Sequence, residues 1–275
     1  MKTIGFIDYY ISEWHANNYP EWIKTASSVL GLDYQVKYAY ASLDVSPVDG
    51  ITTDEWCEKY GIERCMTIEE ICNKADYLII LAPSDPDEHP ALAKEALKCG
   101  KKTYIDKTFA SSYSAAVEIF NMAEASGAEI FSTSALRYAD ELGDFESPRS
   151  AITTGGGGNL PEYIIHQIEM GVKKLGVGAV SVEAYEEGEE TVCKVAYNDE
   201  RNLEMRYSRK NPFTFSNGDK TVKISSDFFG GLIRDILRFF NGEEAPVKKE
   251  DTLEVMKIRE AAIRAYENLG TTVMI

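Results

Sequence analysis

Residues 77–81 read Tyr-Leu-Ile-Ile-Leu, an apolar run without a polar break. Such a run is typical of a central strand of a parallel sheet, which is buried on both faces. Outward from it, the sequence alternates between strand and helix patterns, and the other strands are predicted at 2–7, 34–40, 103–105 and 128–132. This alternation predicts an α/β fold, with a Rossmann-like doubly wound parallel sheet over residues 1–135 and right-handed crossovers.

Helices are predicted between these strands. Their expected ranges are 20–30, 53–60, a short helix beginning at 67–70, 88–98 and 112–126. Pro20 is expected in the first turn of its helix and Gly31 at its end, because proline suits a helix start and glycine a left-handed C-cap. Thr53 is expected to cap the second helix, and Gly127 to end the last one.

Beyond residue 135 the pattern changes to amphipathic strands, which predicts a mostly antiparallel sheet with one wet face. The expected strands are 180–185, 190–197, 203–208 and 221–225, and the expected helices are 162–175, 228–241 and 251–269. Residues 136–275 are therefore predicted to form a smaller α+β domain, with the junction near 134–143.

The composition excludes several classes of protein. The 275 residues include 29 basic and 45 acidic side chains, a net charge of −16. Such acidity disfavours binding to nucleic acid or to an anionic membrane surface. No apolar run is long enough for a transmembrane helix, and the start lacks a signal-peptide layout, so a cytoplasmic location is expected. The five cysteines form no Cys-x-x-Cys pair, so neither a disulfide framework nor a metal site is predicted.

The turn after the first strand has an unusual composition, Asp-Tyr-Tyr-Ile-Ser-Glu over residues 8–13. In a dinucleotide-binding domain this turn needs glycine, because the backbone approaches a pyrophosphate at the helix N-terminus. Here Asp8 would repel a phosphate and Tyr10 would block the close approach. The glycine run at 155–158 is not a substitute, because it does not follow a strand of the first domain.

Several motifs together resemble the glucose–fructose oxidoreductase/inositol dehydrogenase (Gfo/Idh/MocA) family. They are the strand and turn 75–83, His89, the turn Cys99-Gly100-Lys101, the segment Tyr104-Ile105-Asp106-Lys107-Thr108, the segment 134–138, and Glu162-x-x-x-His166-x-x-Glu169. The resemblance extends over nearly the whole chain, which is divergent from this family and short for it. All three histidines, His15, His89 and His166, fall at family positions.

The resemblance implies that Lys107, Glu162 and His166 form the catalytic group. Lys107 ends a predicted strand, at the edge where open α/β sheets bind ligands. His166 suits acid–base catalysis because the imidazole pKa lies near neutrality. Glu162 lies one helical turn earlier and is expected to orient the ring.

The same resemblance implies a nicotinamide cofactor, NAD or NADP. The candidate cofactor-binding residues are Asp8, Tyr9, Tyr10, Ile11, Asp44, Ala82, Pro83, His89 and Asp106. Asp44 is the candidate for the adenosine ribose, because an acidic residue after the second strand commonly binds it.

Two functions from different classes follow. The first is an oxidoreductase that transfers a hydride between nicotinamide and a hydroxyl of a sugar, cyclitol or related polyol, with a variant in which a resident nicotinamide is recycled. The alternative is a non-redox small-molecule-binding or regulatory protein with a degenerate nucleotide loop. The resemblance also implies that residues 136–275 form the substrate and oligomerisation domain and that the protein is a homodimer or homotetramer.

Overall fold

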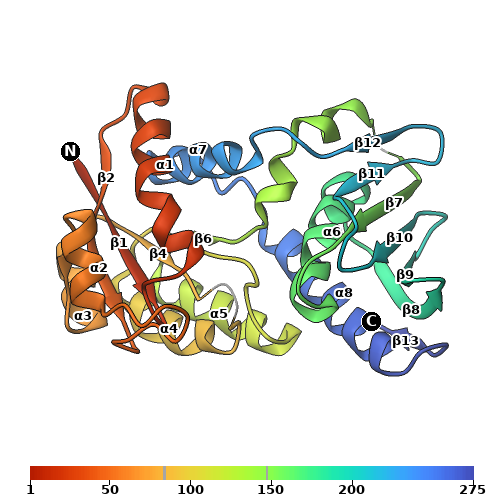
Figure 1. Cartoon of the computed structure of the whole chain (residues 1–275), viewed down its shortest axis with the longest axis horizontal. Helices are drawn as coiled ribbons and strands as arrows, with labels where there is room; N and C mark the ends of the chain where they lie inside the picture. Colours follow the sequence, from red (N-terminus) through yellow and green to blue (C-terminus); the bar gives the residue numbers. More distant parts are fainter. Residues whose placement is uncertain (83–84, 147) are drawn as a thin grey trace. The chain divides into compact units, whose positions relative to one another are not determined.

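The computed structural model describes residues 1–82, 85–146 and 148–275 and divides into two compact units (Figure 1). The first unit comprises Met1–Ser132 with Leu232–Val247, and the second comprises Thr133–Gly231 with Lys248–Ile275. The chain thus returns to the first unit after most of the second unit is complete. The sequence did not indicate this return, and the assignment of 1–135 and 136–275 to domains remains a prediction.

The described residues of the first unit form a six-stranded parallel sheet in the order β3-β2-β1-β4-β5-β6. The strands are β1 Lys2–Asp8, β2 Tyr34–Ala41, β3 Glu63–Arg64, β4 Tyr77–Ile80, β5 Thr103–Ile105 and β6 Ile130–Phe131. Leu78, Ile79 and Ile80 have no exposed surface. The prediction of a doubly wound sheet with 77–81 at its centre is confirmed.

Helices join these strands. They are α1 Trp14–Leu30, α2 Thr53–Tyr60, α3 Ile68–Lys74, α4 Glu88–Ala96 with the 3-10 turn η1 Leu97–Cys99, and α5 Tyr113–Ser126. Helix α1 starts well before Pro20, so the predicted start is wrong: Glu13 supplies the N-cap, a residue type that is not a usual start signal. The cap of α2 is Thr52 rather than Thr53. The predicted end of α1 at Gly31 is confirmed by its left-handed φ of 65°.

Helix α7, Phe228–Phe240, carries the chain back into the first unit. Its aromatic side chains pack against the sheet: Phe239 lies 5.0 Å from Phe131, and Phe240 stacks on Tyr77 at 4.7 Å, both between ring centroids. Phe239 and Phe240 are therefore part of the first unit's core.

The second unit contains a mixed sheet, which over the described residues has the order β12-β11-β7-β10-β9-β8-β13. Its strands are β7 Ser150–Gly155, β8 Ala179–Glu187, β9 Glu190–Tyr197, β10 Asn202–Tyr207, β11 Thr214–Ser216, β12 Thr221–Lys223 and β13 Thr272–Met274. In this part of the chain, β7 and β10 run parallel and the other paired strands run antiparallel. The mostly antiparallel sheet is confirmed, although β7, β11 and β13 were not predicted.

Helices α6 Leu160–Leu175 and α8 Lys249–Glu267 pack on this sheet and on each other, and the 3-10 turns η2 Ala135–Tyr138 and η3 Asp140–Asp144 precede β7. Gly171 allows α6 to approach β10 closely, because a Cβ at this position would lie 2.4 Å from the Leu203 side chain. None of the described helices combines the length and the apolar character needed to cross a bilayer.

Candidate functional site

Helix α1 begins at a carboxylate of the chain itself. Glu13 Oε1 accepts a hydrogen bond from the Ala16 N–H, and Oε2 accepts one from the His15 N–H at 2.8 Å. Oε2 also lies 3.1 Å from the His15 ring nitrogen Nδ1. The first N–H groups of a helix carry partial positive charge and attract anions. Glu13 supplies that anion here, where a phosphate would lie in a dinucleotide-binding domain.

Asp8, the last residue of β1, is only 1% exposed. Its Oδ1 accepts hydrogen bonds from the Tyr9 N–H at 2.7 Å and the Ala82 N–H at 3.0 Å, while its buried Oδ2 has no hydrogen-bond partner. Burial, reinforced by the nearby Glu13 charge, raises the pKa of the Asp8 carboxyl well above its usual value. The site therefore favours the neutral acid.

A second buried carboxyl, Asp106, follows β5. Its Oδ1 accepts hydrogen bonds from the Tyr104 hydroxyl at 2.9 Å and the Tyr19 hydroxyl at 3.2 Å. Its Oδ2 lies 3.7 Å from His15 Nε2, so His15 stands between Asp106 and Glu13. Contacts among acidic, imidazole and phenol groups therefore connect Glu13, in the turn after β1, with Asp106 after β5.

A cavity of about 270 Å³ opens beside this turn and is lined by Asp8, Tyr9, Tyr10, Glu13, Pro47, Ala82 and Asp85. Burial, more than the nearby Glu13 carboxyl, raises the pKa of the Tyr10 phenol. These residues do not fit a pyrophosphate, because the N–H groups at the helix start are already occupied and the lining offers carboxyl groups instead of a cation.

Ile11 and Asp44, two further predicted cofactor residues, have structural roles. Ile11 is 1% exposed and lies in the core. Asp44 forms an ion pair with Arg64 at 2.8 Å, and Arg64 also binds Asp54 at 2.9 Å. Pro83 lies outside the described residues.

His89 is fully buried on α4. Its Nδ1 lies 2.7 Å from the Thr108 carbonyl oxygen, and its Nε2 contacts the Leu81 carbonyl oxygen. Burial lowers the pKa of this imidazole, and its contacts with the two carbonyl oxygens oppose that shift. His89 therefore ties together the loops that follow β4 and β5.

Lys107 lies in the loop after β5, in agreement with its predicted place at a strand end, and it is half-buried. It belongs to the first unit, whereas Glu162 and His166 belong to the second. The convergence of these three residues on one substrate remains a prediction.

His166 projects from α6 and is held by Ser134. The Ser134 Oγ lies 2.6 Å from His166 Nδ1 and accepts a hydrogen bond from the Leu136 N–H at 3.3 Å. A hydroxyl can donate to a bare ring nitrogen or accept from a protonated one. Ser134 therefore supports the ring in both protonation states, as acid–base chemistry requires.

Ser134 is fixed in turn by a buried ion pair. Glu169 Oε1 accepts a hydrogen bond from the Ser134 N–H at 3.1 Å, and Glu169 Oε2 accepts one from Thr133 at 3.1 Å and one from the Arg137 guanidinium at 3.2 Å. Arg137 also binds Asp251 of α8 at 2.5 Å. Burial raises the pKa of Glu169 although Arg137 opposes the shift. This network positions the imidazole.

Glu162 lies in the first turn of α6, one turn before His166. Asn159 caps this helix through its Oδ1, which accepts the Glu162 N–H at 3.0 Å, and its Nδ2 donates to Glu162 Oε2 at 3.2 Å. The rings of Tyr163 and Phe213 flank His166, with centroids 5.9 and 5.6 Å away. The site thus combines an imidazole and a carboxylate with an aromatic wall.

Sequence reasoning missed the roles of Ser134 and Glu13. Ser134 belongs to the segment 134–138 that resembles the family, but nothing in its local sequence indicates an imidazole 32 positions away. Glu13 did carry a signal: an acidic residue directly before a helix can bind the helix N-terminus.

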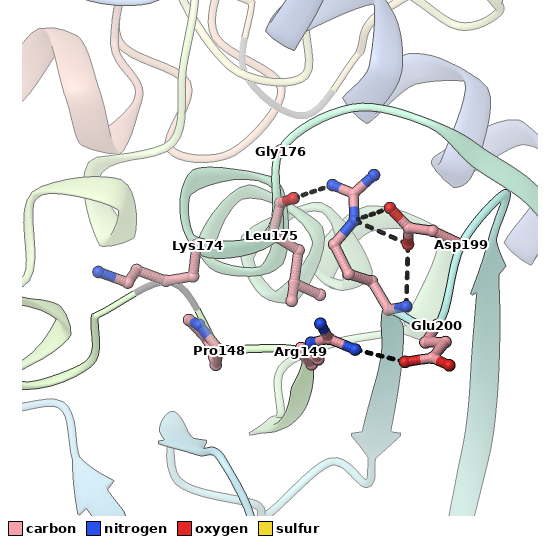
Figure 2. A pocket seen from close by; sticks show the side chains of 8 residues that line it. Pro148, Arg149, Lys174, Leu175, Gly176, Asp199 and Glu200 are labelled. Atoms are coloured by element: carbon pink, nitrogen blue, oxygen red, sulfur yellow. Dashed lines mark hydrogen bonds and ion pairs between the residues drawn. The ribbon is translucent and has the colours of Figure 1, made fainter.

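A further cavity, of about 460 Å³, lies at the other end of α6 (Figure 2) and is lined by Pro148, Arg149, Lys174, Leu175, Gly176, Asp199, Glu200 and Arg201. Arg201 binds Asp199 at 2.9 Å and caps the Leu175 carbonyl, and Arg149 pairs with Glu200. These charges largely neutralise one another. Among the described side chains, no group of His, Cys, Asp and Glu is arranged to hold a metal ion.

Comparison with a family model identifies part of the first unit. Residues 45–133 match the model described as "Oxidoreductase family, NAD-binding Rossmann fold" (Gfo/Idh/MocA). The match begins after the β1–α1 turn, so it leaves out the segment in which Asp8 and Glu13 replace glycine. No curated protein matches the chain by sequence.

The fold is similar to that of several solved structures. An NAD-binding oxidoreductase from Klebsiella pneumoniae has a TM-score of 0.75 at 14% identity, covering 100% of this chain and 99% of that one. An aldose-aldose oxidoreductase from Caulobacter crescentus, complexed with glycerol, has a TM-score of 0.75 at 13% identity, covering 100% and 99%. A putative myo-inositol dehydrogenase from Sinorhizobium meliloti 1021 has a TM-score of 0.72 at 14% identity, covering both chains fully. At such low identity the similarity shows a shared fold.

Proposed function

We propose, on the premise that this chain belongs with the Gfo/Idh/MocA oxidoreductases, that it transfers a hydride between NAD or NADP and a hydroxyl of a sugar, cyclitol or related polyol. The family match and the shared fold support an oxidoreductase. The names of two structural neighbours, an aldose oxidoreductase and a putative myo-inositol dehydrogenase, favour a hydroxylated small molecule as the substrate. The observation that carries the proposal is the hydrogen bond between Ser134 and His166.

The chemistry of a hydroxyl explains why this pair matters. Oxidation of an alcohol to a carbonyl releases the hydroxyl proton, and the reverse reaction needs a proton donor. In our proposal, His166 exchanges this proton at Nε2 while Ser134 holds Nδ1. Glu162 stabilises the charged imidazolium, and Lys107 hydrogen-bonds the substrate hydroxyl and favours proton loss.

One observation favours the second candidate, a non-redox small-molecule-binding or regulatory protein. The β1–α1 turn does not fit a pyrophosphate, because Glu13 occupies the start of α1 and Asp8 is buried beside it. A scaffold that has lost hydride transfer would need no phosphate cradle. Homodimer or homotetramer assembly and a cytoplasmic location remain predictions for either function.

Nucleotide binding separates the two candidates. The protein is purified without added nucleotide and titrated with NAD and NADP by calorimetry, and mass spectrometry identifies any small molecule that co-purifies. Heat on titration, or a nicotinamide nucleotide that co-purifies, supports the oxidoreductase. Absence of both, up to about millimolar ligand, a range in which binding free energy is only about −4 kcal/mol, rejects it.

A further inference from the structure

The cap of α1 differs in chemistry from the other side-chain caps in the described chain. Helices α2, α3, α5 and α6 are capped by Thr52, Thr67, Ser112 and Asn159. These are neutral residue types that commonly begin helices. At α1 the cap is Glu13, whose two oxygens bind the N–H groups of His15 and Ala16. A carboxyl group, instead of a hydroxyl or an amide, therefore lies on the N–H groups at this helix start.

The surroundings of Glu13 hold it in place. Its carboxylate is about nine-tenths buried, with 7% of the side chain exposed, and His15 Nδ1 lies 3.1 Å from Oε2. A buried carboxyl group needs hydrogen-bond partners, and this one contacts two backbone N–H groups and an imidazole nitrogen. The contact of Glu13 with the start of α1 is therefore held in place by its surroundings.

A phosphate cannot use the same groups at the same time. The pyrophosphate of a dinucleotide binds a helix start through its N–H groups and its dipole. Both attractions are already satisfied by Glu13, and Asp8 and Asp85 line the adjoining cavity. An arriving phosphate would meet an occupied position and a carboxyl-rich wall.

We propose that the Glu13 carboxylate is an internal competitor of the nucleotide pyrophosphate, so that NAD or NADP binds at α1 only when Glu13 leaves the helix N-terminus. Glu13 is then the residue that sets nucleotide affinity. This inference rests on the proposed function, because it concerns that function's cofactor. Displacement exposes the N–H groups of His15 and Ala16 to the phosphate.

Calorimetric titration of Glu13→Gln and Glu13→Gly with NAD, NADP and inorganic pyrophosphate tests this competition. Glutamine keeps an oxygen acceptor for the helix cap and removes the charge, whereas glycine removes the side chain at small cost to the cap. Both variants should bind NAD or NADP about tenfold more tightly than the wild type, the ratio that corresponds to about 1.4 kcal/mol.

Glu21→Gln is the matched control. Glu21 lies on the exposed part of α1, so its substitution makes the same change in net charge on the same helix away from the N-terminus. Its nucleotide affinity should equal that of the wild type. Circular dichroism confirms that each variant is folded.

The outcomes separate this inference from the function on which it rests. If wild type binds NAD or NADP and the Glu13 variants bind no more tightly, the inference is overturned and the cofactor stands. If no form binds either nucleotide, the cofactor is rejected, and the pyrophosphate titration decides about Glu13: tighter pyrophosphate binding in Glu13→Gly supports the competition, and unchanged binding overturns it.

Discussion

The starts of α1 and α6 are built in opposite ways. Helix α1 follows β1 through a turn without glycine and is capped by Glu13, whereas α6 follows β7 through the glycines of 155–158 and is capped by Asn159. A Cβ at Gly156 would lie 2.6 Å from the Ser208 carbonyl oxygen, and one at Gly157 would lie 2.1 Å from the Tyr163 ring. Close packing therefore requires glycine in the turn before α6. The glycines before α6 therefore serve packing. The turn before α1, where a dinucleotide-binding domain needs glycine, has none.

The two units also support their buried carboxyl groups differently. Glu169 of the second unit binds the Arg137 guanidinium, a hydroxyl and a backbone N–H. Asp8 of the first unit has two backbone N–H groups and no hydrogen-bond partner at Oδ2. The second unit therefore holds a paired charge that positions Ser134, whereas the first unit favours a neutral acid.

The largest expected effect is on turnover, through His166→Ala. Loss of a general acid or base typically lowers turnover by about 10²–10⁴-fold. Turnover is measured from the absorbance of the reduced nicotinamide with a panel of sugars, cyclitols and related polyols, and nucleotide binding by calorimetry. Binding should not change, because His166 lies in the second unit and the expected nucleotide residues lie in the first. Unchanged turnover would show that His166 is not the general acid or base. The proposed division, with acid–base chemistry in the second unit and nucleotide binding in the first, would then be wrong.

The second largest expected effect is a loss of folding stability in Arg137→Leu. Removing one partner of a buried ion pair costs about 3–5 kcal/mol, because the other charge stays buried. Urea unfolding of the whole chain measures this loss. The control is Arg149→Leu, which breaks an ion pair to Glu200 whose side chains are 78% and 82% exposed and should cost less than about 1 kcal/mol. Equal losses for the two variants would show that the Arg137 network does not stabilise the second unit.

Asp8→Asn should change folding stability less than Arg137→Leu, and it should increase stability instead of lowering it. The folded state raises the pKa of Asp8, so between its unfolded and folded pKa values the folded protein binds more protons than the unfolded one. Wild-type stability should therefore fall, relative to Asp8→Asn, as pH rises from about 4 through the folded pKa, by at most about 1.4 kcal/mol per pH unit. Urea unfolding at several pH values measures the difference. A difference that does not change with pH would show that Asp8 is ionised in the folded protein.

Local signals predicted elements best where pattern and environment agree. The strand at 77–81 is an apolar run buried on both sides, and Gly31 ends α1 in the left-handed conformation that favours glycine. The start of α1 was wrong because a glutamate at the N-cap is a weak local signal. Strand β7 was missed because its pairing with β10, distant in sequence, defines it.

The residues of the candidate site also fall into two groups, those that a local sequence pattern indicated and those that it did not. His166 and Glu162 were selected from residue type and spacing on one helix, and Lys107 from its place after a strand. Ser134, Glu169 and Arg137 acquire their roles from contacts over 32 to 35 positions, and no local pattern encodes such a contact.

The amino-acid sequence alone determined the alternating α/β start, the mostly antiparallel second half and the absence of glycine after β1, because periodicity and residue type act over a few neighbouring positions. Only the tertiary structure decided that Glu13 closes the start of α1, that Ser134 holds His166, and that residues 232–247 return to the first unit. These features depend on which side chains folding brings together and removes from water, and burial and hydrogen-bond partners then set their charge and orientation.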